Sequence, residues 1–137
     1  MDDFRQIIVL RKDLNMRKGK MVAQGAHASM ATILANGRTH WLTKILGFIG
    51  IKVLILDLKD KAMGPWLTGK FKKITVSVNS EAELFEIYNK AKESGLNASL
   101  ILDSGLTEFK EPTYTAVAIG PDLTSKISPV TGHLPLL

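Results

Sequence analysis

One stretch of this chain restricts its fold more than any other, because it places a well-marked helix between two strands. Ile74–Val78 alternates apolar and polar side chains, which is typical of a half-buried strand. The helix then begins with a capping box, in which Ser80 can accept from the N–H of Glu83 while the Glu83 side chain reaches back to Ser80. Gly95 ends this helix and Ala98–Leu102 forms the next strand. The side of the helix expected to be buried holds Leu84, Ile87, Tyr88 and Ala91.

The rest of the chain adds strands and one long helix in an order that indicates an α/β protein. Strands are predicted at Gln6–Arg11 and at Thr115–Ile119, the second closed by Gly120-Pro121. The long helix occupies Lys20–Ala35, and a short helical turn is expected at Asp122–Ile127. We therefore expect residues 1–137 to form a single three-layer α/β/α domain with a mixed sheet of about four strands. The apolar stripe expected to be buried on the long helix is Val22, Ala26, Ser29, Met30 and Ile33.

An apolar insert near residues 38–61 interrupts this pattern. Trp41–Leu58 is strongly apolar but carries three charged side chains, whereas a membrane-spanning helix has few. Ile51–Leu56 favours a strand, and Pro65–Leu67 favours a short helix that ends at Gly69. Three interpretations are open for the insert: packing against the body of the domain, an interface between subunits, or contact with a membrane.

Composition excludes several kinds of site. The chain has no Cys, so neither a disulfide nor a thiolate metal site can form. It also lacks a nucleophile elbow and a glycine-rich phosphate loop. The opening MDDFRQIIVL is acidic and its apolar run is short, which favours a first strand over a signal peptide and leads us to expect a cytoplasmic protein. The histidines lie too far apart in sequence for the spacing of metal ligands, so no metal site is expected; they are His27, His40 and His133.

Positive charge is concentrated in the first half of the chain. The net charge is +5, with 14 basic and 5 acidic residues in positions 1–73 but 4 and 8 in positions 74–137. Such an asymmetry indicates an anionic partner, most often a nucleic acid. A solvated basic face without a specific partner explains the charge equally well. The densest basic stretch holds Arg11, Lys12, Arg17, Lys18 and Lys20 against Asp13 alone.

Two places in the sequence gather polar groups suited to chemistry. Lys20, Gln24 and His27 have the i, i+4, i+7 spacing that puts them on one face of a helix. Asp103 follows an apolar strand, where open α/β sheets hold their ligands. The ordinary alternatives are a polar helix face with a surface histidine, and a carboxylate that only caps its own turn. The hydroxyl groups nearby in the pattern are those of Thr107 and Thr115.

Several blocks in a fixed order resemble the archaeal and eukaryotic type of peptidyl-tRNA hydrolase. Val9–Ser29 (VLRKDLNMRKGKMVAQGAHAS) is similar to that family's opening strand, its R-x-D-L-x-M-x-K-G-K stretch and the Q-x-x-H-A of its first helix. Ser99–Thr107 (SLILDSGLT) is similar to its S-L-I-x-D-A-G-R-T. The resemblance covers residues 6–36 and about 66–137, and its further blocks are Val78–Glu81, Thr115–Pro121 and Thr131–Leu134.

The resemblance implies hydrolysis of the ester that joins a peptide to the 3′ end of tRNA. It also implies no metal or organic cofactor, no obligate membrane contact and, commonly, a homodimer. Lys20 is then expected to stabilise the developing oxyanion or hold the terminal phosphate, and Asp103 to orient or deprotonate water. His27 has a suitable ordinary pKa for a base, whereas Asp103 needs a raised pKa for that role near neutral pH. Thr115 and Thr107 are expected to hydrogen-bond substrate or water. The other implied residues are Gln24 in the wall of the site and Arg11, Lys12, Arg17 and Lys18 on the tRNA backbone.

Leu106 departs from the family pattern, because it stands where the family has Arg. An Arg there could bind phosphate or steady Asp103, so its absence raises the alternative of a tRNA-binding module with impaired catalysis. A second alternative is an interaction protein whose functional surface is Trp41–Leu58. The presence of the whole polar set, from Lys20 to Thr107, favours the enzyme.

Overall fold

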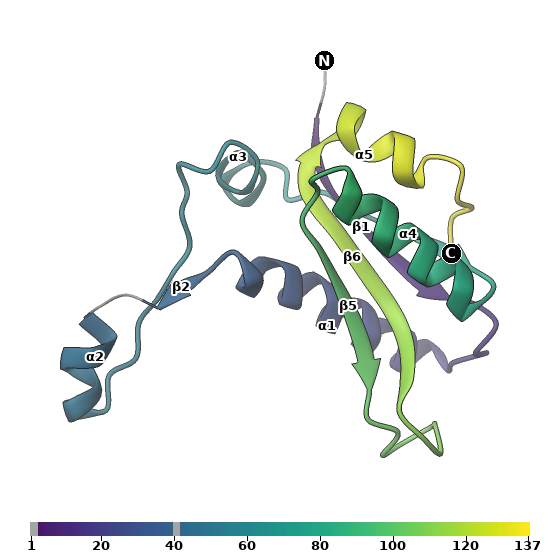
Figure 1. The fold of residues 1–137 in the computed structure, drawn as a ribbon, viewed down its shortest axis with the longest axis horizontal. Coiled ribbons are helices and arrows are strands. Elements are labelled where there is room, and N and C mark those ends of the chain that lie inside the picture. The colour runs from purple at the N-terminus through teal and green to yellow at the C-terminus, as the bar shows by residue number, and fades with distance from the viewer. Residues whose placement is uncertain (1–2, 40–41) are drawn as a thin grey trace.

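The computed structural model describes residues 3–39 and 42–137, which form a four-stranded mixed sheet with helices on both faces (Figure 1). The strand order is β4-β1-β6-β5, with β1 and β4 parallel and with β6 antiparallel to both of its neighbours. The predicted three-layer α/β fold with a mixed sheet is confirmed. Its strands are β1 (Phe4–Arg11), β4 (Lys73–Val78), β5 (Ala98–Asp103) and β6 (Thr113–Leu123).

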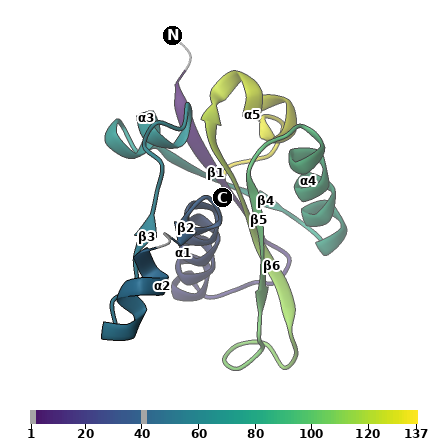
Figure 2. The ribbon, with the colours of Figure 1, turned by 60° about the vertical axis from the view of Figure 1, so that its left-hand side comes forward.

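The sheet separates one long helix from two shorter ones, as Figure 2 shows. Helix α1 (Lys18–Ala35) covers one face, while α4 (Glu81–Glu93) and α5 (Thr124–Thr131) cover the other. Successive side chains of a strand point to opposite faces, so β1 contributes to both layers, which explains its continuous apolar run. The α1 layer includes Ile8, Leu10, Ala28, Ala116 and Ala118, and the opposite layer includes Ile7, Val9, Val78, Leu84 and Ile87.

Helix α4 forms as its sequence predicts, with one difference at its start. The hydroxyl oxygen of Ser80 accepts from the N–H of Glu83 at 3.1 Å. The Glu83 carboxylate accepts from the N–H of Asn79 at 2.7 Å, one residue earlier than the capping box predicts. Gly95, with a φ of +71°, follows the end of the helix. The predicted apolar side is confirmed, with Leu84, Ile87 and Ala91 buried and Tyr88 packed against them.

The side of α1 that faces the sheet differs from the predicted stripe. Val22 is 73% exposed and Met30 is 51% exposed, and Ala26 is exposed as well. Of the five predicted positions only Ser29 and Ile33 are buried. The prediction was wrong because α1 has two apolar sides, and apolar spacing does not say which of them the sheet covers. The buried residues of α1 are Gln24, Gly25, Ala28, Ser29, Thr32 and Ile33.

Strand β6 continues through Gly120-Pro121, where the sequence predicted its end. Its last residue, Leu123, pairs with Phe4 of β1. Gly120 has a φ of +92°, and a Cβ there would lie 2.9 Å from the carbonyl oxygen of Arg5, so the position requires glycine. Because the strand runs on, the last helix begins at Thr124 and is longer than the predicted turn.

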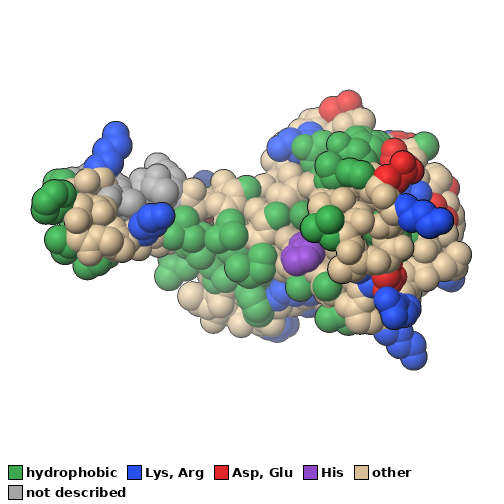
Figure 3. All heavy atoms as spheres, turned by 90° about the horizontal axis from the view of Figure 1, so that it is seen from below, with side chains coloured by type: hydrophobic (Ala, Val, Ile, Leu, Met, Phe, Trp, Pro, Cys, Tyr) green, Lys and Arg blue, Asp and Glu red, His purple; other side chains and the backbone are tan. Residues whose placement is uncertain are grey.

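Residues 38–39 and 42–58, called the arm below, lead from the C-terminal end of α1, and most of them project away from the sheet (Figure 1). Figure 3 shows hydrophobic and basic side chains on this projection. The arm is made of short elements, including a two-stranded ribbon in which β3 is shorter than the predicted strand. These elements are β2 (Arg38–Thr39), α2 (Leu42–Leu46), a 3-10 helix at Gly47–Ile49 and β3 (Leu54–Ile55).

Several apolar side chains of the arm are exposed. Phe48 is 95% exposed, Ile49 64% and Ile45 60%. Of the three interpretations, packing against the body therefore does not hold for these three residues, because they lie on a projection that the sheet layers do not cover. Leu56, near the end of the arm, does pack against the cluster that contains Ile33 and Trp66. Trp41, the first residue of the predicted apolar segment, lies outside the described residues. No helix in the described part of the chain is long and apolar enough to cross a membrane.

The base of the arm is anchored by α3 (Met63–Thr68), which ends before Gly69 as predicted. Trp66 is 1% exposed and packs with Met63 and with Ile33 of α1. Its indole N–H donates to the carbonyl oxygen of Lys72 at 2.8 Å. This cluster holds the C-terminal end of α1, while the polar residues of the same helix lie at its other end.

Candidate active site

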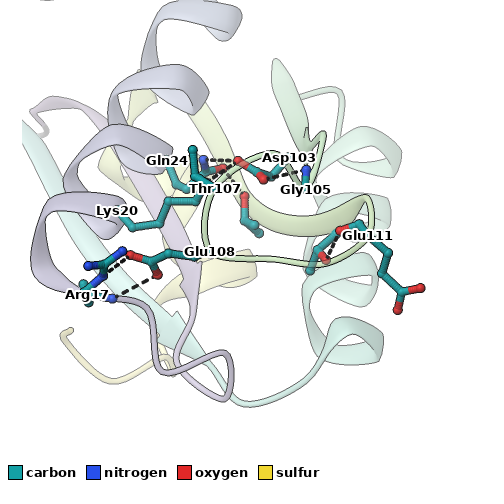
Figure 4. Close-up of polar contacts among 10 residues, drawn as sticks. Arg17, Lys20, Gln24, Asp103, Gly105, Thr107, Glu108 and Glu111 are labelled. Atoms are coloured by element: carbon teal, nitrogen blue, oxygen red, sulfur yellow. Dashed lines mark hydrogen bonds and ion pairs between the residues drawn. The ribbon is translucent and has the colours of Figure 1, made fainter.

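Polar side chains from α1 meet the end of β5 and the loop after it (Figure 4). Lys20 Nζ donates to Asp103 Oδ2 at 2.6 Å and to Thr107 Oγ1 at 2.9 Å. Gln24 Nε2 donates to the same Asp103 oxygen at 2.9 Å. The structure therefore brings together four of the predicted site residues, although the two on α1 lie 79 to 87 positions before their partners in the sequence.

Local structure explains why these groups converge. Lys20 is in the first turn of α1, and Gln24 follows one turn later on the same side of the helix. Asp103 is the last residue of β5, and loop 104–112 turns back from it toward α1. This turn requires Gly105, whose φ is +79° and where a Cβ would lie 2.6 Å from the backbone of Glu111. The N–H of Gly105 donates to Asp103 Oδ1 at 3.0 Å.

The environment of Asp103 favours its charged form. The Lys20 ammonium that hydrogen-bonds the carboxylate lowers the pKa of Asp103 below its ordinary value of 3.8, with further lowering from the Gly105 N–H and the Gln24 amide. Burial acts in the opposite direction but does not prevail. The side chains of Lys20 and Asp103 are each 12% exposed, so water screens this ion pair only in part. Asp103 is thus a carboxylate at neutral pH.

The hydrogen-bonding capacity of these groups is not exhausted by their mutual contacts. A carboxylate accepts about four hydrogen bonds, and Asp103 accepts from Lys20, Gln24 and Gly105. An ammonium donates three, and Lys20 donates to Asp103 and Thr107. One acceptor position on Asp103 Oδ1 and one N–H of Lys20 can therefore serve a reacting molecule, as can the hydroxyl hydrogen of Thr107.

Thr115 lies behind Gln24. Its hydroxyl donates to Gln24 Oε1, and its side chain is fully buried in β6. Since the amide oxygen of Gln24 is held by Thr115, its NH₂ group faces Asp103. The structure therefore connects Thr115 to the carboxylate through Gln24.

Among the predicted catalytic residues, His27 is the one that the structure does not join to this network. Lys20, Gln24 and Ala28 follow one another at four-residue steps along the side of α1 that faces the sheet, and Ala28 is fully buried. The three-residue step from Gln24 to His27 turns the imidazole away from that side, and His27 is exposed. The i, i+4, i+7 spacing put Gln24 and His27 on one helix face, but it could not show that only Gln24 faces the sheet.

The predicted phosphate-binding residues also divide into two groups. The Arg11 side chain is 10% exposed, and its guanidinium donates to the carboxylates of Asp13 and Glu81 and to the carbonyl oxygen of Tyr114. These contacts leave little of Arg11 for an outside anion. Lys12, Arg17 and Lys18 are exposed around the start of α1.

Two residues at the site, Glu108 and Phe109, were not predicted from the sequence. Arg17 Nε donates to Glu108 Oε1 at 2.6 Å, and the ring of Phe109 lies with its centroid 5.2 Å from Lys20 Nζ. Neither contact joins residues that are close in sequence, since Arg17 and Glu108 lie 91 positions apart. The only signal was their place beside Thr107, which the sequence had already marked. No group of three or more side chains suited to metal binding occurs among the described residues.

The presence of Leu106 in place of the family's Arg does not prevent Asp103 from being charged. The Leu106 side chain is 86% exposed on loop 104–112. The charge of Asp103 is stabilised by Lys20, Gln24 and Gly105 instead. Its ionisation therefore needs no Arg at position 106.

The fold and the site together define a three-layer α/β protein in which an ammonium, a carboxylate and a hydroxyl group meet at the end of β5. The family model for Peptidyl-tRNA hydrolase PTH2 matches residues 4–137. This chain belongs to that family.

Named relatives agree over nearly the whole chain. A peptidyl-tRNA hydrolase of Methanocaldococcus jannaschii is 43% identical over 133 residues, which are 97% of this chain and 99% of that protein. One from Aeropyrum pernix is 36% identical, with 98% and 97% covered. A probable peptidyl-tRNA hydrolase 2 of Dictyostelium discoideum is 35% identical over 98% of this chain and 55% of its own length.

The contacts of Asp103 predict its titration. Because its pKa is lowered, the Asp103 carboxylate is half protonated only at a pH below the ordinary value of 3.8. The carboxyl carbon resonance of Asp103, followed by NMR, is expected to give a titration midpoint below 3.8. Lys20→Met should raise this pKa, and Lys18→Met, which removes a lysine two residues away, should leave it as in the wild type. A midpoint for wild-type Asp103 above 4 contradicts the described contacts.

Proposed function

We propose that this chain hydrolyses the ester bond of peptidyl-tRNA, releasing the peptide and free tRNA. The observation that carries the proposal is the contact of Lys20 Nζ with both Asp103 and Thr107, in a member of the peptidyl-tRNA hydrolase family. The same contact provides a positive and a negative group side by side, which is what attack of water on an ester requires.

Asp103 orients the attacking water in this mechanism. The fourth acceptor position of its carboxylate, on Oδ1, receives a hydrogen bond from that water. The lowered pKa makes Asp103 a weak base, so it stabilises the charge that develops on the water instead of storing a full proton. As the bond between the acyl carbon and the ribose oxygen breaks, the proton lost by the water ends on that ribose oxygen, which leaves as the hydroxyl group of the free tRNA. Of the two roles that the sequence left open, orientation is the one that the pKa supports.

Lys20 stabilises the ester oxygen as it becomes negative. Two of its N–H groups are held by Asp103 and Thr107, so the third has a defined direction. A pre-oriented charged donor of this kind is effective because it needs little reorganisation in the transition state. Thr107 lies beside it and can donate its hydroxyl hydrogen to substrate or water.

The tRNA is proposed to approach over the start of α1. Lys12, Arg17 and Lys18 are exposed there, and the N-terminal end of a helix favours an anion. The basic first half of the chain supports the same partner.

We propose that the protein acts in the cytoplasm, where its substrate is produced by translation. Nothing in the site favours the alternative of an impaired binding module, because the charge on Asp103 does not depend on position 106.

We also propose that two copies of the chain associate through an apolar groove between α1 and β4. The groove has a volume of 680 Å³ and lies on the side of α1 away from Asp103. The exposed stripe of Val22, Ala26 and Met30 borders it, with four-residue spacing. An exposed apolar stripe of this kind indicates an interface, and a two-fold axis can place it against its own copy. The groove also contains Leu10, Met21, Ile33 and Phe71.

Turnover tests the proposed activity. Purified protein is expected to release the blocked amino acid from an N-acetylated aminoacyl-tRNA, with no loss of rate in EDTA. Lys20→Ala and Asp103→Ala should each lower kcat roughly 10²-fold, because both groups act on charge that develops in the transition state. Lys92→Ala, on the opposite face of the sheet, serves as the control. Rates near the wild-type value in both site variants would place the chemistry elsewhere, and no release by the wild type would reject the activity.

Light scattering tests the proposed association. The wild type should have twice the chain mass of 15.0 kDa. The double change Val22→Glu and Met30→Glu should give a monomer, because it places charge in the groove. Phe48→Glu and Ile49→Glu on the arm make the matched control and should leave the mass doubled. A wild-type monomer rejects the dimer, and a monomer from the arm variant alone moves the interface to the arm.

A further inference from the structure

The start of α1 lacks the groups that usually support a helix N-terminus. Arg17 occupies the N-cap position, and its side chain makes no capping hydrogen bond there. The first turn contains no acidic residue but carries Lys18 and Lys20. Free N–H groups and the helix dipole make this end positive, so two lysines add repulsion. The catalytic lysine proposed above thus stands on a helix end that needs a negative partner from elsewhere.

Glu108 supplies that partner from loop 104–112. Its Oε1 accepts from Arg17 Nε at 2.6 Å, and its Oε2 accepts from the backbone N–H of Arg17 at 3.4 Å (Figure 4). One carboxylate therefore binds both the side chain and the backbone at the N-cap. The Arg17 side chain is 83% exposed, but that of Glu108 is only 17% exposed. Hydrogen bonding to Arg17 lowers the pKa of Glu108, so this carboxylate is charged at neutral pH.

The two neighbours of Glu108 both contact the same lysine. Thr107 accepts from Lys20 Nζ at 2.9 Å, and the centroid of the Phe109 ring lies 5.2 Å from Nζ. Phe109 also packs against the apolar layer beneath α1. Because Glu108 stands between them in the chain, fixing its carboxylate on Arg17 fixes the positions of both neighbours relative to Lys20.

The rest of the loop is held at its ends. Gly105 donates to Asp103 at the start, and Thr113 Oγ1 donates to the carbonyl oxygen of Glu111 at 2.9 Å at the end. These contacts tie the loop to the strands, whereas Glu108 ties its middle to α1. Without the Glu108 contact, the middle of the loop keeps the contact of Thr107 with Lys20 and the packing of Phe109, but no ion pair to α1 among the described residues.

We propose that Glu108 is a positioning residue for the hydrolysis, because its ion pair with Arg17 holds loop 104–112 on the start of α1 and so directs Lys20 Nζ at Asp103. This inference rests on the proposed function. It also gives Arg17 a second role, since a residue expected only to bind phosphate now also orders the site. An ion pair with one solvent-exposed partner contributes little to stability, and the Arg17 side chain is 83% exposed, so loss of the pair is expected to change the geometry of the site more than the melting temperature.

Kinetics of four single variants and one double variant test the proposal. Glu108→Ala and Arg17→Ala should each lower kcat roughly tenfold or more, since small displacements of a reacting group cost that much. Glu108→Gln, which keeps the shape of the side chain but not its charge, should lie between Glu108→Ala and the wild type. The double variant Arg17→Ala/Glu108→Ala should have the kcat of the worse single variant, because the pair is already broken in either one.

Lys18→Ala is the matched control, because it removes the next basic residue without touching Glu108. It should raise KM and weaken the salt dependence of tRNA binding while changing kcat little. A wild-type kcat in Glu108→Ala overturns the proposal. So do losses in kcat that multiply in the double variant, or a loss of kcat in Lys18→Ala equal to that in Arg17→Ala.

Amide hydrogen exchange gives a readout that does not depend on turnover. The N–H of Gly105 should exchange faster in Glu108→Ala and in Arg17→Ala than in the wild type or in Lys18→Ala, with melting temperatures alike. Unchanged Gly105 exchange in both variants overturns the proposal even if kcat falls. Faster exchange in a protein that releases no amino acid from the acylated tRNA rejects the proposed function and keeps the positioning contact.

Discussion

The ion pair between Lys20 and Asp103 joins the first turn of α1 to the end of β5, and the site depends on it. Its Nζ–Oδ2 distance of 2.6 Å connects residues that the sequence separates by 83 positions. The pair keeps Asp103 charged, gives Lys20 its direction and brings Thr107 within reach. Other contacts serve this pair. Thr115 orients Gln24 behind the carboxylate, and Glu108 holds the loop in front of the lysine.

The parts of the account that sequence could predict are local or repeat at a fixed spacing. The capped helix after Ser80, the strand before Asp103 and the four-residue step from Lys20 to Gln24 each follow from neighbouring residues and a known period. The resemblance of several ordered blocks then connected them to one family, which the match over residues 4–137 confirms. The resemblance implied that Lys20 and Asp103 belong to one site, but their direct contact was not predicted, because no period links two distant segments.

The parts that sequence did not predict depend on which neighbour each side chain meets. Val22 and Met30 have helical spacing for a core, but the sheet covers the adjacent side of α1. Arg11 belongs to the basic stretch, yet carboxylates of Asp13 and Glu81 occupy it. Phe48 is as apolar as a core residue and lies on a projection. In each case the chemical character of the residue is clear from the sequence. The side chains that it meets in the fold are not, because they come from a different segment of the chain.

The central claim is that the charged Asp103 carboxylate, and not an imidazole, is the group on which hydrolysis depends. The pH dependence of kcat/KM, measured from about pH 5 to pH 8 in the wild type and in His27→Ala, tests it most directly. If the carboxylate is that group, neither protein loses activity on the acid side with an apparent pKa near the ordinary histidine value of about 6.5. An acid limb near that pH in the wild type that disappears in His27→Ala would contradict it and assign the base to His27.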